Sequence, residues 1–132
     1  MNRRSRPKPG PRSRRPAQRR TPALRVEIAW RLRKSWRAVP LLRRVAEYAA
    51  RAEGFRTGDL SVAVVGARTI RRLHHRFLGA AAVTDVLAFH FNRDRREGRL
   101  DGEIVLCGEL ARRRCRHRRP WLSAARAELA LY

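Results

Sequence analysis

The sequence predicts one α+β domain, or a closely related α/β sandwich, in which helices cover a four-stranded mixed sheet. Three observations support this fold class. The 132 residues suffice for one domain and not for two. Hydrophobic periodicity marks four strands and four helices. Their order is strand, helix, strand, helix, strand, strand, helix, helix, which fits a mixed sheet with helical layers.

Residues 1–21 are predicted to form a disordered basic tail that precedes the domain. Residues 1–20 contain nine Arg or Lys, four Pro and no acidic residue, with very few apolar side chains. Such a segment cannot bury enough apolar surface to offset the entropy lost on ordering. The folded domain is therefore expected to occupy residues 22–132.

The first two elements of the domain are a strand and a helix. Apolar and other residues alternate over 24–30, which predicts a half-buried strand. Pro40 then fits the first turn of a helix, and Gly54 supplies its end. Apolar residues at helical spacing are expected to face the core, namely Leu41, Leu42, Val45, Tyr48, Ala49 and Ala52.

The next strand and helix bring a basic surface. Alternation over 60–64 predicts the strand. The helix has Ile70, Leu73 and Phe77 on one face, and Gly79 ends it. Its outer face is a candidate phosphate contact, although a merely solvated charged face explains it equally well. That face carries Arg68, Arg71, Arg72, His75 and Arg76.

Residues 83–107 are predicted to hold two central strands. Residues 86–91 are apolar except for His90, which is typical of a strand buried on both faces. Residues 103–107 repeat the pattern. The segment 92–102 between them contains seven charged side chains and two glycines, so we expect a long surface loop.

Two helices are predicted to end the chain. The first has Glu109 in its first turn and arginines towards its end, which suits the helix dipole, and its buried residues are expected to be Leu110, Ala111 and Cys115. The second has Ser123 as its N-cap and runs to Tyr132 with no end signal. Its expected inward residues are Trp121, Leu122, Ala125, Leu129 and Tyr132.

The formal net charge of +22 indicates a polyanionic partner. Thirty-one of the 33 basic residues are arginine, whose planar fork suits phosphates and bases, so nucleic acid is favoured over a membrane. A compositional bias is the alternative source of the arginine excess. No apolar run would span a bilayer, and we expect a cytoplasmic protein. Cys107 and Cys115 are expected to be reduced core residues.

Two short segments resemble a known family. Residues 84–89, Thr-Asp-Val-Leu-Ala-Phe, resemble the Thr-Asp-Val-Leu-Ser-Phe signature of the YbeY family of rRNA maturation factors, and residues 102–105, Gly-Glu-Ile-Val, resemble its Gly-Asp-Ile-Val strand. The resemblance covers about residues 24–132 and implies the same fold. It also implies a single-strand-specific, zinc-dependent endoribonuclease that acts on ribosomal RNA and in ribosome quality control.

The family's zinc motif, His-Gly-x-Leu-His-Leu-x-Gly-Tyr-Asp-His, does not follow residues 128–132, so we expect the domain of 22–132 to be C-terminally incomplete. Histidines four apart on a helix share one face, and a third histidine leaves a coordination position for water. The histidines of this chain, His74, His75, His90 and His117, lack that spacing. We therefore predict neither metal nor cofactor for the 132 residues, and no activity of this chain alone.

The resemblance also indicates residues of an RNA-binding cleft. Asp85 is the signature acid that would shape the cleft floor, and the alternative is a bond to nearby backbone. His74 occupies the place of a family Asn, and Leu78 occupies that of an Arg held to contact RNA, a role in which Arg76 can substitute. The predicted RNA contacts are Arg68, Arg71, Arg72, Arg76, Arg112 and Arg113.

Three functions follow from this reading. The favoured one is an rRNA-processing endoribonuclease with ribosomal RNA and the ribosome as partners and no small-molecule cofactor. The second is a non-catalytic RNA- or ribosome-binding protein, in which the basic surface holds RNA without chemistry. The third is a generic basic domain of unrelated function.

Overall fold

The structure is a computed structural model that describes residues 23–33, 37–117, 126–128 and 130. The predicted basic tail, residues 1–21, lies outside the described residues. So do the predicted N-cap Ser123 and all five residues expected on the inward side of the last helix. Residues 126–128 and 130 are helical, as the prediction for that helix requires.

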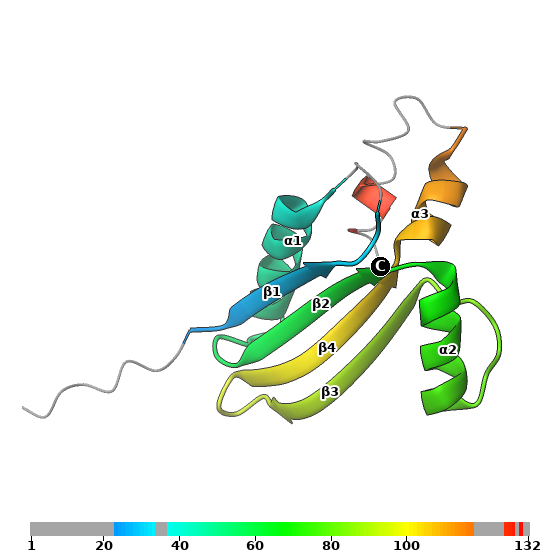
Figure 1. The fold of residues 1–132 in the computed structure, drawn as a ribbon. Helices are drawn as coiled ribbons and strands as arrows, with labels where there is room; N and C mark the ends of the chain where they lie inside the picture. The colour runs from blue at the N-terminus through cyan, green and yellow to red at the C-terminus, as the bar shows by residue number, and fades with distance from the viewer. Residues whose placement is uncertain (1–22, 34–36, 118–125, 129, 131–132) are drawn as a thin grey trace, which may run out of the picture.

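One four-stranded sheet forms the centre of the fold (Figure 1). The strand order is β1-β2-β4-β3, in which β1 and β4 both run parallel to β2 and β3 runs antiparallel to β4. The predicted mixed sheet of an α+β domain is therefore confirmed. Its elements are β1 (Arg25–Trp30), α1 (Val39–Ala52), β2 (Asp59–Val65), α2 (Ala67–Leu78), β3 (Val86–Asp94), β4 (Arg99–Cys107) and α3 (Gly108–Cys115).

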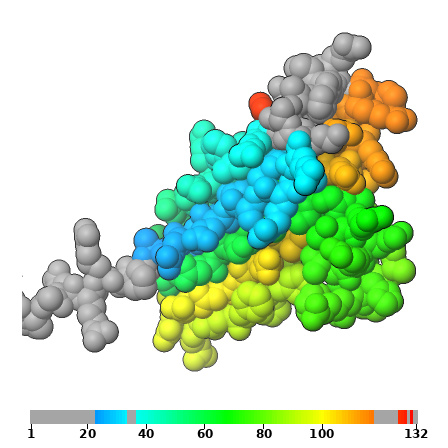
Figure 2. All heavy atoms as spheres, viewed as in Figure 1, coloured from blue at the N-terminus to red at the C-terminus, as the bar shows by residue number. Residues whose placement is uncertain are grey.

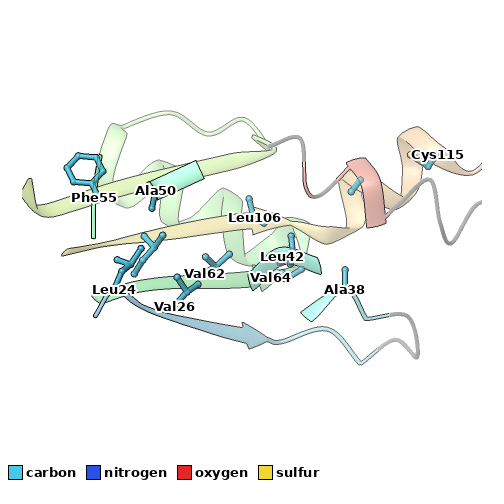
Figure 3. Packing of buried hydrophobic residues seen from close by; sticks show 12 residues of the cluster. Leu24, Val26, Ala38, Leu42, Ala50, Phe55, Val62, Val64, Leu106 and Cys115 are labelled. Carbon is cyan, nitrogen blue, oxygen red and sulfur yellow. The ribbon is translucent and has the colours of Figure 1, made fainter. Parts of the chain in front are cut away.

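Helices pack on both faces of this sheet. Neighbouring residues of a strand point to opposite faces, and β2 accordingly supplies Val62 and Val64 to one hydrophobic cluster and Ala63 and Val65 to another. The first cluster contains the buried residues of β1, α1 and α3 (Figure 3). The second contains fully buried Ile70 of α2. The sheet is thus the middle layer, with α1 and α2 on opposite faces.

The predicted inward face of α1 was wrong by part of a turn. Tyr48 is 77% exposed, and Leu41, Ala49 and Ala52 are exposed as well. Leu42 is buried as predicted, and the side that packs on the sheet continues from it at a spacing of four residues through Ala46 and Ala50. Several alanines on this helix made more than one apolar stripe consistent with the sequence, and contact with β1 and β2 selected one of them.

The prediction that β3 is buried on both faces was also wrong, because β3 lies at the edge of the sheet and only its Leu87 is buried. An edge strand has one neighbour, and α1 packs mainly over β1, which leaves an apolar hollow between α1, β3 and β4. Of the two strands predicted to be central, only β4 has a neighbouring strand on each side. A continuous apolar run does not distinguish these two positions.

The long loop predicted over 92–102 was wrong as well. Both strands continue into this segment, and only residues 95–98 form the turn of a hairpin. Charged side chains are compatible with these strand ends because the ends project beyond α1 and α2 and are largely exposed to solvent. Asp94 stabilises the turn, since its Oδ1 accepts hydrogen bonds from the backbone N–H groups of Arg96 and Glu97 at 2.8 and 3.1 Å.

Two glycines with positive φ test how closely the strands approach. Gly58 has a φ of +110°, and a Cβ there would collide with the backbone carbonyl of Leu100. Gly54 has a φ of +89°, but a Cβ there would meet no atom within 4 Å. Gly58→Ala should therefore lower the free energy of unfolding by about 1–3 kcal/mol more than Gly54→Ala. Urea unfolding measures the difference, and equal losses would contradict the close approach of Gly58 to β4.

Candidate nucleic-acid interface

The helices α2 and α3 begin at the same end of the sheet, where the strands β2 and β4 end (Figure 1). The strands β2 and β4 are adjacent and parallel, and their last pair in register is Val65 with Cys107. Gly66 separates β2 from α2, while α3 follows β4 directly. Because both helices start beside this last pair, they lie close enough to contact each other. The two arginine-rich segments of the sequence are therefore neighbours in space.

Glu109 links the first turn of α3 to the first turn of α2. Its Oε2 accepts a hydrogen bond of 3.0 Å from the backbone N–H of Ala67, the first residue of α2. The N-cap residue of α2 is Gly66, which has no side chain to make this bond. From the sequence, Glu109 was expected only to interact favourably with the dipole of its own helix, α3. No sequence pattern indicated its contact with Ala67, 42 residues away.

The predicted RNA-binding arginines occupy the outer surfaces of these helices. Arg68, Arg71, Arg72, Arg76 and Arg113 are exposed, and Arg112 is half-buried. Within the described residues, none of these six side chains forms an ion pair. In Figure 2 the green surface of α2 is open on the viewed side, with α3 in orange beside it. The result is a surface of uncompensated positive charge at one end of the sheet.

Asp85 occupies the start of β3, where its contacts are to its own neighbourhood. Its Oδ1 accepts the backbone N–H of Val86 at 3.0 Å and lies 3.3 Å from the hydroxyl of Thr84. Its Oδ2 lies 3.2 Å from Nη1 of Arg114 on α3. The carboxylate thus bonds nearby backbone, as the alternative reading expects, and also pairs with an arginine of α3. A role for Asp85 in an RNA cleft stays a prediction.

The other two cleft candidates are engaged elsewhere. Nδ1 of His74 donates a hydrogen bond of 2.8 Å to the backbone carbonyl of Ala82, which ties α2 to the loop before β3. The guanidinium of Arg76 lies 5.5 Å from the centroid of the Phe77 ring. Among the described contacts, no hydrogen bond or ion pair joins His74, Arg76 and Asp85. The structure thus gives each residue separate partners.

Arg114 makes contacts that the sequence analysis did not predict. Besides Asp85 it approaches Glu128, with 3.6 Å between Nη1 and Oε1. It therefore links the start of β3, α3 and the helical residues 126–128. Only the folded chain brings these three segments together, because they are far apart in the sequence.

The donor groups of the described residues do not fit a zinc site. In that part of the chain, no three His, Cys, Asp or Glu side chains are grouped so as to hold a metal ion. Nε2 of His117 accepts a hydrogen bond of 2.9 Å from Arg116. Cys107 and Cys115 are buried and free, as predicted, and burial raises the pKa of the Cys107 thiol, which disfavours the thiolate that binds metals. No zinc-dependent step is assigned to these residues.

Among the described residues, no helix combines the length and the apolar character needed to cross a bilayer.

The bond from Glu109 to α2 can be tested by substitution. Glu109→Ala removes the acceptor for the N–H of Ala67, so the free energy of unfolding should fall by about 1 kcal/mol, as for loss of an N-cap. Glu109→Gln keeps an oxygen acceptor and should lose less. Urea unfolding of both variants measures the two losses. Unchanged stability of Glu109→Ala would show that the contact contributes nothing.

Comparison with known proteins agrees with the fold and the signature residues. Residues 31–131 match the family model described as Endoribonuclease YbeY. The chain is 38% identical over 89 residues to endoribonuclease YbeY of Anaeromyxobacter sp. (strain Fw109-5), a match that covers 67% of this chain and 44% of that protein. The fold resembles the solution structure of TM1509 from Thermotoga maritima, with a TM-score of 0.50 and 20% identity over 82% of this chain and 73% of that one. The chain belongs to the endoribonuclease YbeY family.

Proposed function

We propose that this chain serves the maturation of ribosomal RNA and ribosome quality control in the cytoplasm, in a zinc-dependent endoribonuclease that cleaves unpaired RNA. Membership of the family supports the reaction class. The observation that carries the proposal is the surface of α2 and α3, where six arginines have no acidic partner among the described residues. In this proposal that surface binds the RNA.

The distribution of ion pairs supports this assignment. Apart from Arg114 on α3, which pairs with Asp85 and Glu128, the ion-paired arginines among the described residues lie at the far end of the sheet from α2 and α3, where β1, β2 and β4 start and at the β3–β4 turn. There the charges cancel locally, in the pairs Arg25–Asp59, Arg95–Glu53 and Arg99–Asp101. Positive potential therefore concentrates at the other end, and a polyanion is drawn to that end first.

Arginine suits this task because its guanidinium can form two parallel hydrogen bonds to one phosphate. Phosphate contacts hold an RNA strand without reading its sequence. The proposal therefore assigns to α2 and α3 the retention of the ribosomal RNA or the ribosome surface. Selection of a cleavage position is not assigned to these arginines.

The hydrolytic step is not assigned to the described residues, because their donor groups do not fit zinc. A second candidate function follows from that observation: a non-catalytic protein that binds RNA or the ribosome. The two candidates share the arginine surface and differ in whether RNA is cleaved. In both, the 132-residue chain by itself binds RNA and leaves it intact.

Salt dependence of RNA binding tests the arginine surface. In the double variant Arg72→Gln/Arg113→Gln, the slope of log K against log salt should become shallower by about 0.7 for each lost phosphate contact. Fluorescence anisotropy with a single-stranded rRNA fragment measures the slope. Arg25→Gln/Arg95→Gln removes the same charge from exposed ion pairs at the other end and should leave the slope unchanged. Equal slopes for the two double variants would reject α2 and α3 as the binding surface.

A cleavage assay separates binding from catalysis. The purified chain, loaded with excess zinc and then dialysed, should retain no stoichiometric zinc and should bind the rRNA fragment without cutting it. Gel analysis of the RNA and metal analysis of the protein give the two readouts. Cleavage that a chelator abolishes would show that this chain contains the hydrolytic centre. Absence of RNA binding would reject both candidate functions.

A further inference from the structure

An exposed aromatic ring lies at the end of α2. Phe77 is 55% exposed although it belongs to the apolar face of that helix. The ring of Phe89 on β3 meets it edge to face, with 5.2 Å between the centroids and 61° between the planes. Phe89 in turn packs on the buried cluster that contains Ile70 and Leu87. The Phe77 ring is therefore braced by the core on one side and open to solvent on the other.

A row of arginines leads along α2 to this ring. Arg68, Arg72 and Arg76 recur every four residues, so they follow one line along the helix with a rise of about 6 Å between neighbours. All three are exposed, and none forms an ion pair with another described residue. At the end of the row the Arg76 guanidinium lies 5.5 Å from the Phe77 centroid. Charge and aromatic surface thus meet at one place.

We propose that this row and this ring form a binding site for an unpaired RNA strand, in which the arginines hold successive phosphates and a base stacks on Phe77. The site rests on the proposed function and adds the residues that would hold the unpaired strand and the contact that would distinguish it from a duplex. A base in a duplex is stacked and paired within the helix, and its face does not reach a protein ring. An unpaired base offers its face at little cost, and stacking on an aromatic ring tolerates any sequence.

The surrounding charges favour Phe77 over the other exposed phenylalanine ring, Phe91, as the stacking site. Phe91 on β3 is more exposed, at 72%, and is equally aromatic. It lines a hollow with three carboxylates, those of Glu27, Asp59 and Asp101, and with two arginines, Arg25 and Arg99, which form ion pairs with Asp59 and Asp101. The positive charges there are neutralised, whereas Arg76 beside Phe77 forms no ion pair with another described residue. Phe91 is therefore a matched control for Phe77.

The experiment compares one short RNA oligonucleotide as a single strand and as a duplex by fluorescence anisotropy. Phe77→Leu should weaken binding of the single strand about tenfold, at the value typical for loss of one stacked base, and should leave duplex binding and the salt slope unchanged. Phe91→Leu should change none of these. Arg72→Gln should make the salt slope shallower by about 0.7, and Arg43→Gln, which removes an exposed charge from α1, should not.

The outcomes separate this site from the proposed function. If Phe77→Leu and Phe91→Leu bind the single strand equally well while Arg72→Gln still weakens binding, the stacking site is rejected and the arginine surface stands. If the unmodified chain binds no RNA, the proposed function fails as well. Should Phe77→Leu not fold, Phe77→Trp keeps an aromatic ring. Its added fluorescence, measured against the parent chain, should be quenched by the single strand and not by the duplex, and no quenching would reject the site.

Discussion

The parallel pairing of β2 with β4 is the constraint on which the rest of the structure depends. It runs in register from Leu60 with Gly102 to Val65 with Cys107. These central strands contribute most of the fully buried sheet residues, so they unite the hydrophobic clusters of both faces. Because adjacent parallel strands end at the same end of the sheet, the two helices that follow β2 and β4 must start side by side. The position of the arginine surface is therefore a consequence of strand order.

A second consequence is the separation of charge along the sheet. The ends of β1, β2 and β4 that are remote from α2 carry exposed ion pairs, which contribute little to stability. Their effect is on the electrostatic field, since they cancel positive charge there. Six arginines on α2 and α3 form no ion pair with another described residue, whereas Arg114 on α3 pairs with Asp85 and Glu128. A chain with a net charge of +22 thereby acquires one preferred end for a polyanion.

The structure describes an exposed arginine surface on α2 and α3 and, among the described residues, no group of side chains that could hold a metal ion. The arginine surface depends only on the edge of the sheet and on two helices that the described residues contain. A zinc centre depends on ligands that converge from suitable spacings, and the described histidines do not converge. Glu109 and Arg114 each fix a helix bearing arginines to its surroundings. The arginine surface and a group of metal ligands therefore depend on different features of the fold.

The sequence by itself determined the fold class, the existence of the described elements and the arginine positions on α2 and α3, because these follow from local periodicity and turn residues. Tertiary structure alone decided that β3 is an edge strand, that Tyr48 is exposed while Ala46 and Ala50 pack on the sheet, and that residues 92–94 extend a hairpin. It also decided the bond from Glu109 to α2 and the exposure of Phe77. These features depend on which strands pair and which helix covers them. Such long-range contacts cannot be recognised from the hydrophobic periodicity of a short segment.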